Sequence, residues 1–314
     1  LSAVNELNAA TPFEELTITT QDEHTRATLK IQEGCNNHCT YCIIPSVRGP
    51  IRSRSLSNIR EETQRLVEAG YTELVLTGIH LSSYGKDLGD GSTLLDAIRA
   101  VHEVEGVQRI RLGSLEPTIA TVDFSQSLAA MPKVCPQFHL ALQSGSNTVL
   151  ARMARRYNMT MYMQAVDNLR AAFPLAAFTT DVLTCFPGET EEEYEETRQT
   201  IRDVGYAKIH VFPYSPREGT KAAVMPGQLS KAVKERRTRE LIALGEETAA
   251  SYQAQWLDKE STVLIEEKLG DTWHGYTPEY IPVTIADCPA CAPGRIVTVR
   301  LTESAADGMT GEII

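Results

Sequence analysis

Between residues 28 and 215, short runs rich in β-branched and aromatic residues alternate with amphipathic helical segments. Strands separated by helices are typical of parallel βαβ units, so the alternation predicts an open or closed barrel or a doubly wound sheet. Ligands of such folds bind at the carboxyl ends of the strands, where we expect the functional site. The predicted strands are 27–32, 73–78, 109–114, 138–143, 177–184 and 208–214.

The pattern changes after residue 228. Residues 229–257 form one charged stretch that predicts a long helix. Beyond it, apolar and polar residues alternate between turn residues, as in 296–301, and this predicts a small antiparallel barrel. The start of the chain is polar and irregular, and we interpret it as a linker or the remnant of a further domain. The predicted division is 1–25 for this lead, 26–228 for the main α/β unit, 229–257 for the connecting helix and 258–314 for the barrel.

The amino-acid composition indicates in which compartment the protein works and which classes of partner it can bind. Of the 314 residues, 42% are hydrophobic, yet no apolar run reaches the roughly 18 residues of a membrane span, and the polar start does not resemble a signal peptide. We therefore expect a cytoplasmic protein that does not enter a membrane. The net charge of −11 argues against nonspecific nucleic-acid binding, but local basic clusters such as 231–239 leave specific RNA binding open.

Three of the seven cysteines lie in one short stretch, EGCNNHCTYCIIP, directly after the first predicted strand. Cys35, Cys39 and Cys42 have the spacing C-x3-C-x2-C, and three thiolates suit a soft metal or a cluster. A structural zinc site would need a fourth ligand, and His38 would have to fold back on its own loop to supply it. Three buried thiols without a metal are a further alternative. A four-iron cluster held by three cysteines would leave one iron open for a small molecule.

The spacing, with the aromatic Tyr41 before the last cysteine, resembles the signature of the radical S-adenosylmethionine (SAM) superfamily. The resemblance implies a partial (β/α)6 barrel of parallel strands and a [4Fe-4S] cluster on Cys35, Cys39 and Cys42. It also implies that the open iron binds the amino and carboxylate groups of SAM, and that an electron from a donor such as flavodoxin or ferredoxin releases a 5′-deoxyadenosyl radical. The radical chemistry belongs to these cofactors, while the protein orients them and excludes water.

Further stretches are similar to the methylthiotransferases, which place a CH3–S group on tRNA or on a ribosomal protein. They are KIQEGCNNHCTYCIIPSVRGPIRSR, HLALQSGSNTVLARMARRY, DVLTCFPGETEEEYEET and VFPYSPREGTKAA, and the last small barrel resembles the RNA-binding TRAM module. VLTGIHLSSYG and HVFPYSPREGT resemble the branch that modifies N6-threonylcarbamoyladenosine at position 37 of tRNA. Isopentenyladenosine-37 or a ribosomal protein as substrate, and a non-catalytic metal-containing RNA-binding protein, stay as alternatives.

The resemblance also implies which residues hold SAM. Thr77, Gly78 and Ile79 match the element that receives the SAM amino group, and Arg155 matches the arginine that pairs with its carboxylate. A planar guanidinium suits such bidentate pairing. For Gly78, a plain turn at the end of a strand is an equally good interpretation.

Three more residues lie at strand ends. Glu116 and Gln143 would bond the ribose or the amino group, or they could be solvated residues. His80 is a candidate for the substrate pocket, and without the resemblance a structural histidine would be the more common interpretation.

Several features depart from the family pattern or carry no function. Cys185 stands where the relatives usually have glycine, near the expected adenine pocket, and like Cys135 it is expected in the core. The pair Cys288 and Cys291 has redox spacing but lacks a βαβ setting, and we expect no chemistry there. The family's second [4Fe-4S] cluster would need another cysteine triplet, which these residues lack. We therefore expect this chain to bind and cleave SAM. We also expect that the sulfur-donating half of the protein has been truncated.

The acidic stretch GETEEEYEET is interpreted as the start of a helix. Thr190 and Glu193 have the spacing of a capping box, and acidic side chains suit the positive end of the helix dipole.

Overall fold

The structure is a computed structural model that describes residues 11, 13–15, 25–286, 288–305 and 307–314. The predicted lead segment 1–25 therefore lies almost wholly outside the described residues. The main unit contains the parallel strands β1 (Arg26–Glu33), β3 (Glu73–Gly78), β4 (Arg109–Leu112), β5 (Gln137–His139), β6 (Ala177–Thr184) and β7 (Lys208–Pro213). Its helices are α1 (Ile44–Arg48), α2 (Leu56–Glu68), α3 (Leu94–His102), α4 (Val122–Ala129), α5 (Asn147–Arg152), α6 (Met159–Ala172) and α7 (Glu191–Val204), with the 3-10 turns η1 (Leu81–Ser83), η2 (Pro117–Ile119) and η3 (Lys221–Val224).

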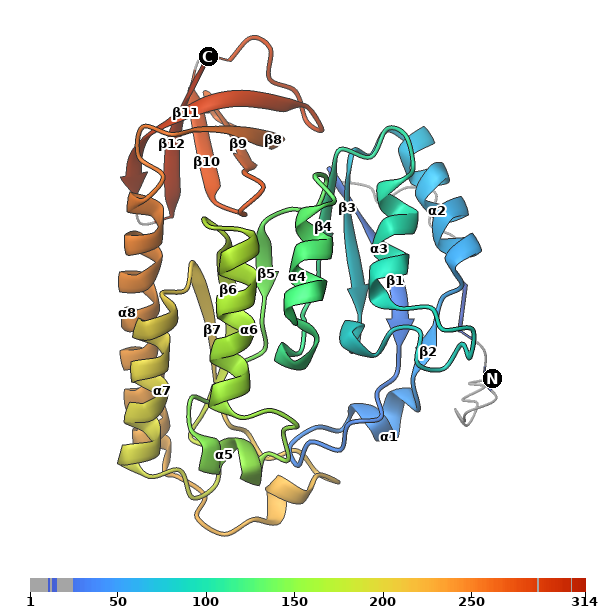
Figure 1. Cartoon of the computed structure of the whole chain (residues 1–314). Coiled ribbons are helices and arrows are strands. Elements are labelled where there is room, and N and C mark those ends of the chain that lie inside the picture. The colour runs from blue at the N-terminus through green and yellow to red at the C-terminus, as the bar shows by residue number, and fades with distance from the viewer. Residues whose placement is uncertain (1–10, 12, 16–24, 287, 306) are drawn as a thin grey trace, which may run out of the picture.

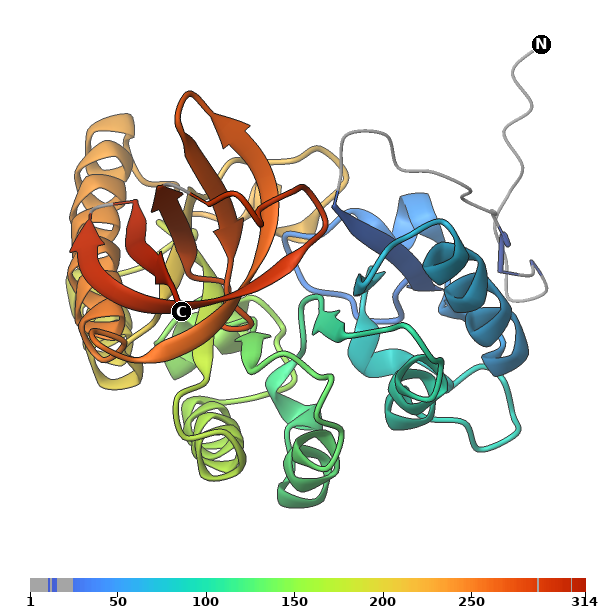
Figure 2. The ribbon, with the colours of Figure 1, turned by 90° about the horizontal axis from the view of Figure 1, so that it is seen from above.

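The six parallel strands follow the order β1-β3-β4 and then β5-β6-β7. The two groups meet through isolated parallel bridges, Ile110 with Val134 and Leu115 with Leu140, and the short β2 (Arg52–Ser53) lies antiparallel beside β1. The helices form an outer layer around the strands (Figure 2). This arrangement confirms the predicted partial (β/α)6 barrel.

The main core lies between the strands and their outer helices. In α2, Ile59 and Leu66 are buried, and Gly70 follows the helix with a φ of +96°. In α7, the capping box between Thr190 and Glu193 is present. These local signals fix where helices begin and end, and so place the loops at the strand ends.

The predicted strand 138–143 is too long. β5 ends at His139, and beyond it only single bridges at Leu140 and Gln143 continue the pairing. Gln143 has a φ of +62°, a left-handed conformation that cannot continue a strand. The chain therefore leaves the sheet early and turns at the carboxyl edge.

The remaining chain forms α8 (Lys231–Ala254) and a closed five-stranded barrel. The barrel strands are β8 (Glu260–Leu269), β9 (Thr272–Tyr276), β10 (Pro282–Ala286), β11 (Ile296–Ala305) and β12 (Gly308–Ile313). All neighbouring pairs are antiparallel except β10 with β12, which is parallel. The predicted small barrel is thus confirmed, with this one parallel pair as the difference from a purely antiparallel one.

The small barrel docks on the amino-terminal ends of the parallel strands. Arg109, in β4, donates hydrogen bonds to the carbonyl oxygens of Tyr276 and Thr262 at 3.1 and 2.9 Å. Arg109 is itself paired with the buried Glu73 of β3 at 3.3 Å. α8 runs along β7 from the carboxyl edge of the strands to the barrel (Figure 1). The barrel and the cysteine loop therefore lie at opposite ends of the strands. Within the described residues, no helix is both long and apolar enough to cross a membrane.

Candidate functional site

The loop with the three cysteines begins where β1 ends. Gly34 has a φ of +68°, and a Cβ atom there would lie 1.8 Å from the carbonyl oxygen of Pro50. The backbone N–H of Cys35 donates to the carbonyl oxygen of Gly49 at 3.1 Å. Glycine is therefore required, because it accepts the left-handed conformation and lets the loop pass directly against residues 49–50.

The other end of the loop is fastened to the ends of later strands through Thr40. Its N–H donates to the carbonyl oxygen of Met153 at 3.0 Å, and its hydroxyl donates to that of Arg152 at 2.9 Å. Its carbonyl oxygen accepts from the N–H of Ala222 at 2.8 Å. Arg152 is in turn held by Glu193 of α7 through two contacts of 2.8 and 2.6 Å. The position of the cysteines thus depends on residues that follow β5, β6 and β7.

The three thiols are half-buried, and none of them is in a disulfide. Burial raises the pKa of the Cys35 and Cys42 thiols, and the neighbouring thiols of the triplet raise both further. Metal coordination deprotonates a thiol, so these thiols would bind a metal as thiolates despite their raised pKa. Among the described residues, no three His, Cys, Asp or Glu side chains surround a single metal-ion position, and His38 is exposed. Three thiols on one loop, none of them in a disulfide, are a donor set that suits a soft metal or a cluster.

Arg155 lies beside this loop. Its Nη1 donates to Cys39 Sγ at 3.3 Å, its Nη2 lies 3.4 Å from Glu116 Oε1, and its guanidinium lies over the ring of Tyr157 at 4.9 Å. Its Nε is buried and has no hydrogen-bond partner among the described residues. Because a buried N–H without an acceptor is costly, this donor fits the carboxylate of a bound ligand.

Glu116 and His80 connect Arg155 to the cysteine loop. His80 Nε2 lies 3.2 Å from Glu116 Oε2 and 3.3 Å from Asn37 Nδ2, while its Nδ1 lies 2.5 Å from Ser83 Oγ. Burial acts to raise the pKa of Glu116, but the hydrogen bond from His80 and the charges of His80 and Arg155 hold that pKa below its ordinary value. The structure thus places a buried carboxylate between an imidazole and a guanidinium.

The end of β3 contacts the start of the cysteine loop through Gln32, which the sequence interpretation missed. Gln32 Oε1 accepts from the N–H of His80 at 2.6 Å, and Gln32 Nε2 donates to the carbonyl oxygen of Gly34 at 2.8 Å. A Cβ atom on Gly78 would lie 2.9 Å from Gln32 Cβ. The predicted segment 77–79 therefore lies against the start of the loop. Glycine is needed at position 78 because the side chain of a larger residue would contact Gln32. Gln32 is fully buried, but β1 holds other polar residues as well, so its immediate sequence does not mark it as part of the site.

Two further strand ends share the left-handed conformation. Gln143, beyond β5, has a φ of +62°, and Cys185, beyond β6, has a φ of +61°. This conformation suits glycine, and Cys185 in its place is strained by roughly 1–2 kcal/mol. Backbone strain of this kind gathers at functional sites. Gln143 is half-buried, and its side chain has no hydrogen bond to any described residue.

Next to Cys185, a buried ion pair corrects one expectation. Glu189 Oε2 accepts from the N–H of Cys185 at 2.6 Å and from Arg237 Nη1 at 2.8 Å. Arg237 is only 2% exposed, so it is not available to RNA as the basic cluster 231–239 had suggested. Burial raises the pKa of Glu189 to about 7, and Arg237 acts against that rise.

Tyr41 anchors the cysteine loop through an aromatic contact. Its ring meets Phe186 edge-on with 6.3 Å between the centroids, and Phe186 meets Tyr214 in the same way at 5.4 Å. Burial raises the pKa of Tyr41, so the phenol stays neutral.

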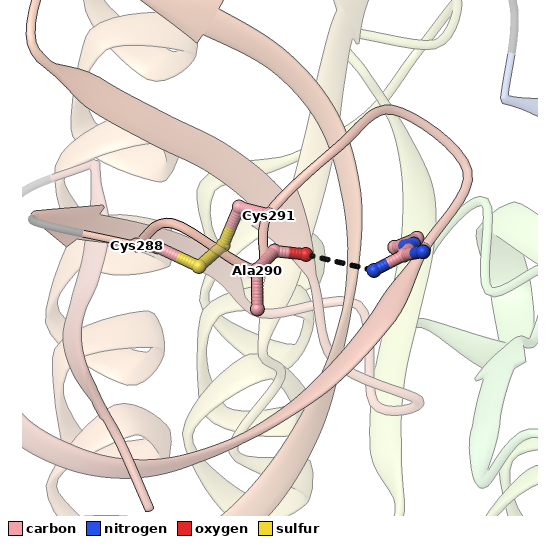
Figure 3. Close-up of a disulfide and its surroundings, with 4 residues drawn as sticks. Cys288, Ala290 and Cys291 are labelled. Carbon is pink, nitrogen blue, oxygen red and sulfur yellow. Dashed lines mark hydrogen bonds between the residues drawn. A yellow bond between two sulfur atoms is a disulfide. The ribbon is translucent and has the colours of Figure 1, made fainter.

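Of the remaining cysteines, the pair Cys288 and Cys291 lies in the small barrel, away from the cysteine loop. Cys288 and Cys291 form a disulfide in the loop between β10 and β11, where the carbonyl oxygen of Ala290 accepts from Arg295 Nη1 at 3.5 Å (Figure 3). This disulfide was not predicted from the sequence. Cys135 and Cys185 are buried in the core, as predicted.

Comparisons with known proteins agree with this geometry. Residues 29–201, more than half of the chain, match the Radical SAM superfamily. The chain is 40% identical over 309 residues to the threonylcarbamoyladenosine tRNA methylthiotransferase MtaB of Bacillus subtilis, a match that covers 97% of this chain and 68% of that protein. It is 36% identical to a tRNA-2-methylthio-N(6)-dimethylallyladenosine synthase of Streptomyces viridosporus, over 91% of this chain and 58% of that protein.

Among solved structures, the fold is similar to that of coproporphyrinogen III oxidase (HemN) of Escherichia coli, a radical SAM enzyme. The TM-score is 0.53 at 14% identity, and the match covers 82% of this chain and 68% of that one. At this identity the similarity shows the fold alone. The chain therefore belongs to the radical SAM superfamily and, within it, to the family of threonylcarbamoyladenosine tRNA methylthiotransferases.

Proposed function

We propose that the protein takes part in adding a methylthio group to C2 of N6-threonylcarbamoyladenosine at position 37 of tRNA, in the cytoplasm. One observation carries the proposal: the cysteine loop, Arg155 and Glu116 meet at the carboxyl ends of the strands. They do so in a chain that is 40% identical, over nearly its whole length, to an enzyme named for this reaction.

In this proposal Cys35, Cys39 and Cys42 would hold a [4Fe-4S] cluster, and the cluster would bind SAM. When bound, the cluster and SAM supply a 5′-deoxyadenosyl radical that takes a hydrogen atom from the substrate. Arg155 pairs with the SAM carboxylate, because its Nε lacks a partner and a guanidinium can donate two parallel hydrogen bonds.

The other strand ends complete the SAM site. The backbone at 77–79 receives the amino group, and Glu116, held ionised by its neighbours, accepts hydrogen bonds from the ligand. The side-chain amide of Gln143 is free to hydrogen-bond the ribose. Tyr41 holds the cysteine loop in place by packing against Phe186. His80 orients Glu116 against Asn37.

Further components lie outside these residues. With three cysteines on the loop, two in a disulfide and two in the core, no second triplet is available for the sulfur-donating [4Fe-4S] cluster of the family. Electrons would come from a flavodoxin or ferredoxin. The tRNA would present its anticodon loop, in which an unstacked base reaches a buried site without duplex opening.

Hydrogen transfer tests this function without requiring the sulfur source. Anaerobically reconstituted protein is mixed with SAM, dithionite and an anticodon stem-loop RNA that carries deuterium at C2 of the threonylcarbamoyladenosine. We expect deuterium in the 5′-deoxyadenosine, measured by mass spectrometry. Cys39→Ala should abolish the product. The double variant Cys288→Ser and Cys291→Ser, a matched change of thiols outside the site, should keep it.

The Streptomyces relative makes dimethylallyladenosine-37 the second candidate substrate. Deuterium transfer from a C2-deuterated dimethylallyladenosine RNA, but not from the threonylcarbamoyl RNA, would establish that alternative. Hydrogen taken only from a ribosomal protein would refute tRNA as substrate. One equivalent of zinc with no SAM cleavage would instead support a non-catalytic RNA-binding protein.

A further inference from the structure

The inner face of β7 carries three exposed side chains. Ile209 and Val211 pack against the main core, and a Cβ atom on Gly245 of α8 would lie 2.5 Å from Ile209 Cγ1, so these residues face outward to the helices. Successive side chains of a strand point to opposite faces. Lys208, His210 and Phe212 therefore face the inside of the partial barrel, and all three are exposed.

Neighbouring strands add two groups to this face. The rings of His139 in β5 and His210 stack with 6.2 Å between their centroids, and Asp181 of β6 lies opposite His210 in the register. His139 Nε2 lies 3.5 Å from Asp181 Oδ2, so this carboxylate already has a partner. Lys208 has none among the described residues. Burial lowers the pKa of His210, which makes it a neutral N–H donor near pH 7.

Phe212, His210 and Lys208 follow one another from the carboxyl end of β7 toward its start. Phe212 is nearest the edge and is 52% exposed, an unusual exposure for an aromatic ring in a strand. His210 and then Lys208 follow at steps of about 7 Å, because alternate residues of a strand are two rises apart. An aromatic ring, a neutral donor and an unpaired cation thus succeed one another along one line.

The proposed substrate has matching groups in the same order. In N6-threonylcarbamoyladenosine the flat adenine is followed by a carbamoyl group, and then by a threonine with a free carboxylate. Five bonds separate ring carbon C6 from the carboxyl carbon, roughly 6 Å when extended, since a chain advances about 3.5 Å per three bonds. The side chain of Lys208 spans the remaining distance between the threonine carboxylate and the Cα atom of Lys208.

We propose that this face recognises the threonylcarbamoyl group, with Phe212 stacked on adenine, His210 donating to the carbamoyl oxygen and Lys208 paired with the carboxylate. The inference rests on the proposed function and names specificity-determining residues for it. A dimethylallyl group is apolar, so it would leave the ammonium of Lys208 without its partner and partly desolvated. Discrimination of this kind arises because unpaired polar groups are costly.

Binding measurements test the inference. The reconstituted protein is titrated into three fluorescent anticodon stem-loops that differ only at position 37, which is adenosine, threonylcarbamoyladenosine or dimethylallyladenosine. Lys208→Gln keeps the length of the side chain and removes its charge. We expect this variant to lose about tenfold in affinity for the threonylcarbamoyl RNA, with little change for the other two. Lys231→Gln, a matched change on an exposed lysine at the start of α8, should affect all three RNAs alike.

The outcomes separate this inference from the proposed function. If Lys208→Gln keeps the wild-type preference among the three RNAs, the inference is wrong, even where deuterium transfer from the threonylcarbamoyl RNA upholds the function. If the wild-type protein takes hydrogen only from the dimethylallyl RNA, the function itself is wrong. Phe212→Leu supplies a second measurement, with weaker binding of all three RNAs expected because each loses base stacking. Unchanged binding by Phe212→Leu would contradict the stacking role.

Discussion

Gly34→Ala is the sharpest test of how the cysteine loop is built. The substitution places a Cβ atom 1.8 Å from the Pro50 carbonyl oxygen and 2.7 Å from that of Gly49, both of them backbone atoms that cannot turn aside. The loop would have to move away from residues 49–50. That movement breaks the hydrogen bond from the N–H of Cys35 to Gly49, now 3.1 Å long.

The expected cost has three parts. A left-handed alanine costs roughly 1–2 kcal/mol. Overpacking adds about 1–3 kcal/mol, and an unpaired buried backbone group adds a similar amount. Gly89→Ala is a matched control, since Gly89 has a φ of +71° but nothing within 4 Å of the added Cβ atom. It bears the first cost alone. The two variants should therefore differ by about 2–6 kcal/mol in the free energy of unfolding.

Urea unfolding of the metal-free protein measures this difference, and iron content after anaerobic reconstitution measures its effect on the loop. We expect Gly34→Ala to be the less stable variant and to retain little iron, while Gly89→Ala reconstitutes normally. Equal unfolding free energies, or full iron content in Gly34→Ala, would show that the close approach to residues 49–50 does not shape the loop.

Three other perturbations follow from the same contacts. Arg155→Lys should weaken SAM binding tenfold to a hundredfold by calorimetry, because a lysine cannot make a bidentate pair with a carboxylate; unchanged affinity would exclude that role. Hydrogen bonds from Arg152 lower the pKa of Glu193 from 4.5 to about 2, so the stability that this carboxylate provides is present above pH 4.5 and is lost as pH falls toward 2. Glu193→Gln should remove about 1 kcal/mol of that pH dependence, allowing for the partial exposure of Arg152, and an unaltered stability profile would contradict this. Arg237→Met should lower the free energy of unfolding by roughly 3 kcal/mol by leaving Glu189 buried without a cation, and a loss below 1 kcal/mol would show that the pair is dispensable.

The sequence predicted the elements whose signals are local. β3 and β6 begin and end at the predicted residues, since each is a run of strand-forming residues bounded by clear breaks. The capping box at Thr190 was recognised because its two partners are three residues apart. The cysteine spacing is likewise local, and it pointed to the loop that the structure places at the carboxyl edge.

Long-range contacts explain what was missed. Gln32 acts through residues that are 48 positions away, and nothing in its immediate sequence reports that contact. Arg237 belongs to a run of basic residues that is typical of a solvated helix face, yet one turn of that helix faces Glu189 in the interior. The early end of β5 follows from a left-handed turn at Gln143, a residue type that carries no turn signal.

The most direct test of the central claim is electron paramagnetic resonance of the reduced, anaerobically reconstituted protein, with SAM labelled with ¹⁵N at its amino group. We predict about four irons per chain and a hyperfine coupling between the cluster and the labelled nitrogen, because three cysteines leave one iron free to bind it. The coupling should vanish in Cys39→Ala. A cluster whose spectrum does not change when SAM is added would contradict the account, and so would a protein that takes up one zinc and no iron.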